Sequence, residues 1–99
     1  MNLQTQFLRE KSFEGYDDSS VLETMLSVAG IRGDIPAIID NMFTEFGSFK
    51  GILEARPAQL MKLPGVTQKT AALVSMVAPL AKVWERCNME NPQRIWSLF

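Results

Sequence analysis

Histidine is absent from the 99-residue chain, and cysteine occurs only once. Without histidine there is no histidine-based catalytic triad, no histidine general base and no histidine-ligated metal site. A single cysteine, Cys87, forms no disulfide within the chain, which excludes a small secreted scaffold stapled by disulfides. No base is visible beside Cys87, and no pair of carboxylates is suitably placed. The sequence therefore predicts no catalytic site, no metal and no cofactor.

Long apolar runs are also absent. The first 15 residues mix charged and amide side chains through their apolar positions, unlike a signal peptide or a membrane span. Apolar residues make up 46% of the chain and charged residues 21%, the proportions of an ordinary soluble domain rather than of a disordered chain. We therefore expect one small cytoplasmic domain without membrane association.

The formal net charge of −1 conceals a difference between the two halves. Residues 1–46 carry eight acidic and three basic side chains, a net of −5, whereas residues 47–99 carry three acidic and seven basic ones, a net of +4. Such an asymmetry can indicate a partner-binding surface. The simpler interpretation is that the charges are scattered over solvated helix faces. The charge distribution alone favours this interpretation over a partner-binding surface.

Apolar residues recur at helical spacing along most of the chain, and no segment has a convincing strand pattern. The clearest stripe lies between a potential cap, Asp34, and a potential left-handed stop, Gly47. Other helices are expected near 3–12, over about 20–29 behind a capping box at Ser20 and Glu23, after a potential cap at Ser48, from Pro57 to Met61, and from Thr67 or Gln68 onward. Pro79 should kink or split the last of these. The predicted fold is an all-α bundle of five or six short helices.

Two segments repeat at an offset of about 35 residues. LSVAGIRGDIPAIIDNM (26–42) aligns with MKLPGVTQKTAALVSMV (61–77), so that Gly30 matches Gly65 and Ile31 matches Val66. Each copy is predicted to be a helix, a glycine turn and a second helix, and the two copies should pack as a pseudo-twofold pair. The predicted organisation is an N-terminal helix and acidic loop over 1–19, a tandem hairpin unit over 20–87, and a tail or linker over 88–99.

The most informative segment is Leu60-Met-Lys-Leu-Pro-Gly-Val-Thr-Gln-Lys-Thr-Ala-Ala72. Gly65 allows a tight turn that a ligand can approach closely, and Val66 should anchor this turn in the core. The amides of the turn and of the next helical turn lack helical partners and lie at the positive end of a helix dipole, an arrangement that suits a phosphate oxygen. The residues predicted to contact a DNA backbone are Lys62, Gly65, Val66, Thr67, Gln68, Lys69 and Thr70. Such contacts read no base edges.

This segment resembles the helix-hairpin-helix motif, whose pattern is roughly L-x-x-[LI]-P-G-[IV]-G-x-[KR]-x-A. Thr67 stands where that motif usually has a second glycine, so a side chain occupies the place where a phosphate should approach. The first copy departs further, because it has Asp34 where the second copy has Lys69. Phosphate binding is therefore predicted for the second copy alone.

A wider set of short motifs is similar to the N-terminal region of the RadC-like proteins, a family labelled as DNA repair proteins. Over about residues 8–87 these motifs are Leu8-Arg-Glu-Lys11, Glu23-Thr-Met-Leu26, Ile31-Arg-Gly-Asp34, Phe46-Gly-Ser-Phe49 and Leu60-Met-Lys-Leu-Pro-Gly-Val66. The resemblance implies a tandem helix-hairpin-helix domain ahead of a metalloprotease-like domain of the JAB type. The histidine zinc site of that second domain has no counterpart here, so a DNA contact is implied but peptidase activity is not.

Two functions remain open at this point. In the first, the second hairpin binds the DNA backbone weakly, without sequence preference and with strong salt dependence. In the second, the domain is a structural or protein-interaction module that packs on a downstream JAB-type domain or another chain. The low net charge, the acidic first half and Thr67 favour the second. Trp84 is expected in the core, Trp96 is a candidate docking residue, and no oligomeric state is predicted.

Overall fold

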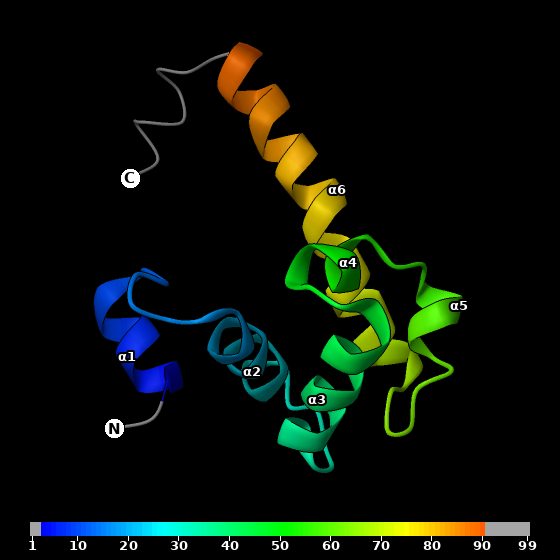
Figure 1. Ribbon diagram of the computed structural model, residues 1–99. Coiled ribbons are helices and arrows are strands. Elements are labelled where there is room, and N and C mark those ends of the chain that lie inside the picture. Colours follow the sequence, from blue (N-terminus) through cyan, green and yellow to red (C-terminus); the bar gives the residue numbers. More distant parts are fainter. Residues whose placement is uncertain (1–2, 91–99) are drawn as a thin grey trace.

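The computed structural model describes residues 3–90, which form six helices and no strand. The helices are α1 (Leu3–Glu10), α2 (Asp18–Val28), α3 (Ile35–Phe46), α4 (Phe49–Glu54), α5 (Pro57–Leu60) and α6 (Gln68–Glu90) (Figure 1). The predicted small all-α bundle is therefore confirmed.

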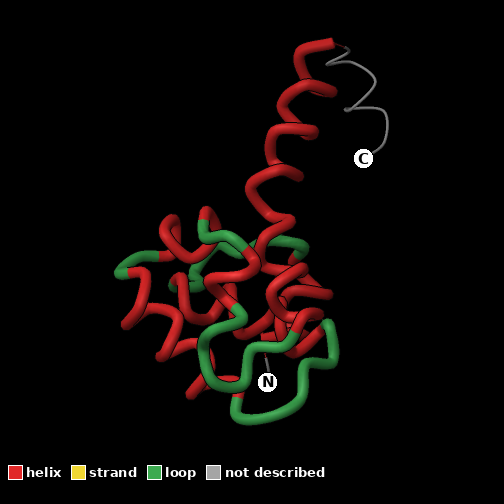
Figure 2. The backbone as a smooth tube through the Cα atoms, turned by 90° about the vertical axis from the view of Figure 1, so that its right-hand side faces the viewer, coloured by secondary structure: helices red, strands yellow, loops and turns green. Residues whose placement is uncertain are grey.

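Two helical hairpins and a connecting helix make up the body of the bundle. α2 packs against α3, α5 packs against α6, and α4 packs against both α3 and α6. The turns of both hairpins lie at the same end of the molecule, at the bottom of Figure 1. The C-terminal half of α6 extends away from the bundle at the other end, as the perpendicular view in Figure 2 also shows.

Two of the predicted helix caps are confirmed. The Asp34 carboxylate accepts a hydrogen bond from the Ala37 amide at 3.1 Å, and α3 ends at Gly47, whose φ is 79°. The Ser48 hydroxyl accepts from the Gly51 amide at 3.0 Å and starts α4. These local signals place α3 and α4 because they satisfy backbone groups that the helix itself leaves unpaired.

The cap of α2 differs from the prediction. Asp17 accepts a hydrogen bond from the Ser20 amide at 2.8 Å, so α2 begins at Asp18 and not at about residue 20. The capping box expected at Ser20 is therefore wrong, and Asp17, expected in a solvated loop, is the N-cap. A carboxylate at this position is favoured twice, since it accepts a hydrogen bond and lies at the positive end of the helix dipole.

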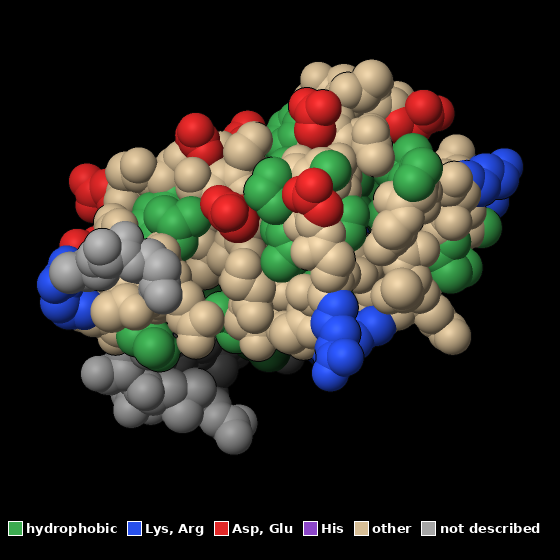
Figure 3. All heavy atoms as spheres, turned by 90° about the horizontal axis from the view of Figure 1, so that it is seen from below, with side chains coloured by type: hydrophobic (Ala, Val, Ile, Leu, Met, Phe, Trp, Pro, Cys, Tyr) green, Lys and Arg blue, Asp and Glu red, His purple; other side chains and the backbone are tan. Residues whose placement is uncertain are grey.

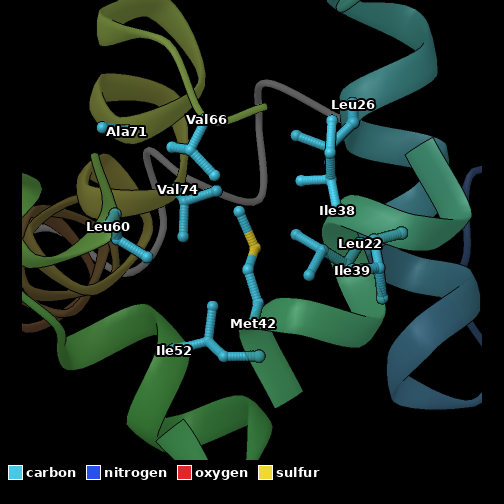
Figure 4. Close-up of a cluster of buried hydrophobic side chains, with 10 residues drawn as sticks. All are labelled: Leu22, Leu26, Ile38, Ile39, Met42, Ile52, Leu60, Val66, Ala71 and Val74. Atoms are coloured by element: carbon cyan, nitrogen blue, oxygen red, sulfur yellow. The ribbon is translucent and has the colours of Figure 1, made fainter. Parts of the chain in front are cut away.

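One apolar core joins the two hairpins (Figure 4). Its buried members are Leu22, Leu26, Ile38, Ile39, Met42, Ile52, Leu60, Val66, Ala71 and Val74. They come from five helices and from the second turn, so neither hairpin has a core of its own. Each hairpin buries its apolar face against the other, as expected for a repeated unit that cannot do so alone.

The two copies of the repeat match at the glycine turns and lose register after them. Gly30 and Gly65 have φ values of 73° and 82°, and both precede a β-branched residue. α3 begins at Ile35, five residues after Gly30, whereas α6 begins at Gln68, three residues after Gly65. The first turn is thus two residues longer, and the offset falls from 35 residues at the glycines to 33 at the helix starts.

A close contact joins the second turn to the first hairpin. A Cβ atom added to Gly65 would lie 3.0 Å from Cγ1 and 3.3 Å from Cδ1 of Ile38, which is 4% exposed. A Cβ atom on Gly33, in the first turn, would lie 3.9 Å from the same Cδ1 atom, and one on Gly30 would meet nothing within 4 Å. Ile38 therefore packs against both turns, and a Cβ atom at position 65 would fit only if the Ile38 side chain shifted by a few tenths of an ångström.

α6 departs from the sequence prediction in two ways. It continues through Pro79 as one helix of 23 residues, so the proline does not split it. The prediction that Trp84 lies in the core is wrong: its exposed fraction is 55%, because this part of α6 extends beyond the bundle. The helix reaches Glu90, past the predicted end of the hairpin unit at residue 87, and Trp96 lies outside the described residues.

Asp17→Ala should lower the melting temperature near neutral pH. Hydrogen bonds from the backbone and then the side chain of Ser20 hold the pKa of the Asp17 carboxyl below its ordinary value of 3.8. Because the pKa is lower in the folded state, this stabilisation is present above the unfolded value and is lost as the pH falls through the folded value. Melting curves from circular dichroism should show a difference between variant and wild type that shrinks as the pH falls below 3.8 and through the lower pKa of the folded state. Asp17→Asn keeps an acceptor and is the control, and a pH-independent difference for Asp17→Ala would contradict the assignment.

Gly65→Ala should destabilise the fold more than Gly30→Ala. Both changes place a Cβ atom on a backbone of positive φ, which costs about 1–2 kcal/mol. Only the Cβ atom at position 65 meets Ile38, which adds an overpacking cost of about 1–3 kcal/mol. Urea denaturation of the two variants measures the difference, and equal losses of unfolding free energy would show that the contact with Ile38 adds nothing.

Candidate nucleic-acid interface

The second turn is closed by its own backbone. The Leu63 amide donates to the Leu60 carbonyl at 3.1 Å, and the Val66 amide donates to the Leu63 carbonyl at 3.2 Å. The Val66 side chain is buried in the core, as predicted for the residue that anchors the turn. Its amide, however, already has an acceptor, so the prediction that Val66 contacts a phosphate is corrected.

Thr67 starts α6. Its Oγ1 atom lies 3.4 Å from both the amide nitrogen and the hydroxyl oxygen of Thr70, and its carbonyl accepts from the Ala71 amide at 3.0 Å. This is the arrangement of an N-cap, although the side-chain contact is long. Glycine has no side-chain oxygen and cannot make this contact. Thr67 thus has a structural role at the position where the motif usually has glycine.

Thr70 faces the interior. Its side chain is fully buried, and its hydroxyl lies near that of Thr67. A buried hydroxyl cannot reach a phosphate in solvent, so Thr70 is removed from the predicted contacts. Thr67 and Thr70 are three residues apart, which is the spacing of a helix N-cap and the amide that it binds. The sequence pattern is therefore as consistent with an N-cap at Thr67 as with two phosphate ligands.

The other five predicted residues lie together on the surface. Lys62, Gly65, Thr67, Gln68 and Lys69 are all exposed. The amides of the last four donate to no acceptor among the described residues. They lie at the N-terminus of a 23-residue helix, where free amides and the helix dipole favour an anion.

The two hairpins carry opposite charge. Residues 57–90, from α5 to α6, contain four basic and two acidic side chains, with no acidic one before Glu85, whereas residues 17–46 contain six acidic side chains and one basic. Neither Lys62 nor Lys69 forms an ion pair with another described residue, so both charges are available to a ligand. An anion is therefore attracted to the second hairpin and repelled by the first.

The basic surface is small. Figure 3 views the molecule from the end that carries both turns, and there the lysine and arginine side chains lie in separate groups while acidic side chains gather along one side. A duplex lying on this end would thus meet few positive charges. This limits the number of phosphates that the domain neutralises and hence its affinity.

The described residues contain neither a metal-binding cluster nor a membrane-spanning helix. Within residues 3–90, no group of three or more acidic or cysteine side chains is arranged to hold a metal ion. Cys87 is exposed, and no helix of this part of the chain combines the length and apolarity needed to cross a membrane.

Comparison with known proteins points to the same part of the chain. A family model described as "Helix-hairpin-helix motif" matches residues 48–74. This range starts at the cap of α4 and ends in α6, so it includes the whole second turn and excludes the first hairpin. No curated protein and no solved structure matches the chain. The comparisons thus support a helix-hairpin-helix unit around Gly65 and do not support membership of the RadC-like family.

Proposed function

We propose that this domain binds the phosphate backbone of DNA, without sequence preference, through the turn at Gly65 and the N-terminus of α6. The observation that carries the proposal is the set of four amides without acceptors that lies beside Lys69, in a stretch of chain without acidic residues. Amides and a lysine at a helix N-terminus bind phosphate oxygens and leave the bases unread. The motif match adds support, because helix-hairpin-helix motifs commonly contact DNA in this way.

The expected affinity is low and depends on salt. Two or three phosphate contacts correspond to a slope of about −2 to −3 in a plot of log K against log salt concentration. The six acidic side chains of residues 17–46 add repulsion between the first hairpin and the same duplex. Binding should therefore be measurable at low salt and weak at physiological salt.

A second candidate function is a protein-interaction module. It is favoured by the exposed apolar side chains of Leu80, Val83 and Trp84 on the projecting half of α6. Exposed apolar groups of this size commonly mark contact surfaces. The resemblance to RadC-like proteins adds the hypothesis that the contact is with a downstream JAB-type domain. This surface lies on another part of the molecule, so the two functions are compatible.

Lys69→Glu should weaken DNA binding about tenfold or more at low salt, because it reverses a charge beside the phosphate site. Fluorescence anisotropy of a labelled duplex measures this change. Arg32→Glu is the matched control, since it makes the same charge change at an exposed position of the first turn. Equal losses for the two variants, or binding by wild type that ignores salt, would contradict the proposed site. Circular dichroism checks that both variants fold.

Thr67→Gly should strengthen DNA binding several-fold, because it removes the side chain from the path of the phosphate and permits a closer approach. The stability cost should be small, since glycine is itself an acceptable N-cap, only a few tenths of a kcal/mol below threonine. Thr67→Ser keeps both the Cβ atom and the cap oxygen, so it should leave the affinity unchanged. The same anisotropy assay compares the three proteins, and an unchanged affinity for Thr67→Gly would show that the threonine does not limit the approach.

A further inference from the structure

The N-terminus of α3 already holds an anion. The Asp34 carboxylate accepts a hydrogen bond from the Ala37 amide at 3.1 Å, and the Asp34 carbonyl accepts one from the Ile38 amide at 3.0 Å. Pro36, in the first turn of the same helix, has no amide hydrogen to donate. A carboxylate of the protein itself therefore occupies the place that a phosphate would take at the start of α3.

The equivalent start of α6 holds no such anion. Lys69 stands where the first copy of the repeat has Asp34, and the amides of Gln68 and Lys69 donate to no acceptor among the described residues. Residues 26–42 carry two acidic side chains and one basic, whereas the matching residues 61–77 carry two basic side chains and no acidic one. The second turn therefore attracts a phosphate, and the first turn repels it.

The two turns are neighbours in space. Cβ atoms added to Gly33 and Gly65 would lie 3.9 Å and 3.3 Å from the same atom, Cδ1 of Ile38. The two positions are therefore closer together than the Debye length, which is about 10 Å at 0.1 M salt. Asp34 directly follows Gly33, and both turns lie at the same end of the molecule (Figure 1). A nucleic acid that contacts the second turn is thus exposed to the charge of the first.

Duplex and single-stranded DNA meet this pair of turns differently. A duplex is straight over the length of the protein, because its persistence length is about 50 nm. Its second row of phosphates lies across a groove about 6 or 12 Å wide, so phosphates extend beside the first turn while others contact the second. A single strand has one row of phosphates and half the charge per unit length, and it can bend away from the first turn.

Base stacking does not contribute to the choice between these two forms of DNA. No aromatic residue occurs between residues 50 and 83, a range that includes the whole second turn. Proteins that bind single strands tightly stack the bases on aromatic side chains, so contacts at this turn are limited to the backbone. The choice between the two forms of DNA therefore depends on charge.

We propose that the domain binds one strand of DNA at a time and prefers single-stranded to duplex DNA, with Asp34 as the residue that sets the preference. The proposal rests on the phosphate site proposed at Gly65 and adds the form of DNA that this site accepts. Asp34 contacts no DNA in this arrangement and acts by repelling the second row of phosphates. The expected preference for the single strand is about threefold or more at 0.1 M salt.

Competition between the two forms of DNA tests this preference. Fluorescence anisotropy follows the displacement of a labelled pyrimidine single strand by the same strand unlabelled, or by a duplex of equal length, at about 0.1 M salt. The single strand should be the better competitor, by about threefold or more at equal molar concentration. A duplex that competes equally well or better overturns this inference and leaves the phosphate site standing. No binding of either DNA, even at low salt, overturns both proposals.

Asp34→Asn tests the role of the carboxylate. Asparagine is as good an N-cap as aspartate, so this variant keeps the cap of α3 and removes only the charge. The duplex affinity should rise about threefold and the single-strand affinity should change less, so the preference narrows.

Glu45→Gln is the matched control, because it removes the same charge at an exposed position near the other end of α3. The two positions are about 16 Å apart along the helix, which is more than the Debye length at 0.1 M salt. Circular dichroism checks that both variants fold. An unchanged preference in Asp34→Asn, or an equal effect of the two variants, overturns the assignment to Asp34.

Discussion

The packing of Gly65 on Ile38 is the constraint on which the rest of the structure depends. Ile38 belongs to the first hairpin and Gly65 to the second, and a Cβ atom added to Gly65 would lie only 3.0 Å from Cγ1 of Ile38. The backbone of the second turn therefore lies against the core, with Val66 buried and the residues that follow it exposed. The glycine that the helix-hairpin-helix motif associates with phosphate is thus favoured by the packing of the protein itself and by the positive φ at this position. A loss of DNA binding on changing Gly65 would not separate the two roles, which is why Lys69 and Thr67 are the better probes.

The parts of the fold that depend on neighbouring residues could be predicted from the sequence. The caps at Asp34 and Ser48 and the stop at Gly47 are local signals, and the structure has all three. The cap at Asp17 is harder to predict because Ser20 and Glu23 offer a competing cap three residues further on. The exposure of Trp84 is unpredictable for another reason: helical spacing shows which residues share a face, but only the tertiary structure shows whether another helix covers that face.

The position of the candidate site could be predicted from the sequence, but the set of residues that contact a phosphate could be predicted only in part. The turn at Gly65 and the exposure of Lys62 and Lys69 agree with the sequence pattern. The amide of Val66 and the side chain of Thr70 are used within the protein and not for a phosphate, because the closed turn supplies acceptors that the sequence alone does not show. The repeat helps to locate the turn, yet its two copies differ in turn length and in the sign of their charge.

The continuity of α6 has a mechanical consequence. The helix runs without a break from Gln68, in the second turn, to Glu90, a length of about 33 Å. Anything attached near Glu90 is consequently held within a narrower range of distances and directions from the turn at Gly65 than a flexible linker would allow. Pro79 lacks the amide that would bond to the Ser75 carbonyl, so bending of this rod concentrates there. A force applied at the far end of α6 is therefore transmitted along the helix toward the turn. Among the described residues of α6, Pro79 is the position at which the helix bends most easily.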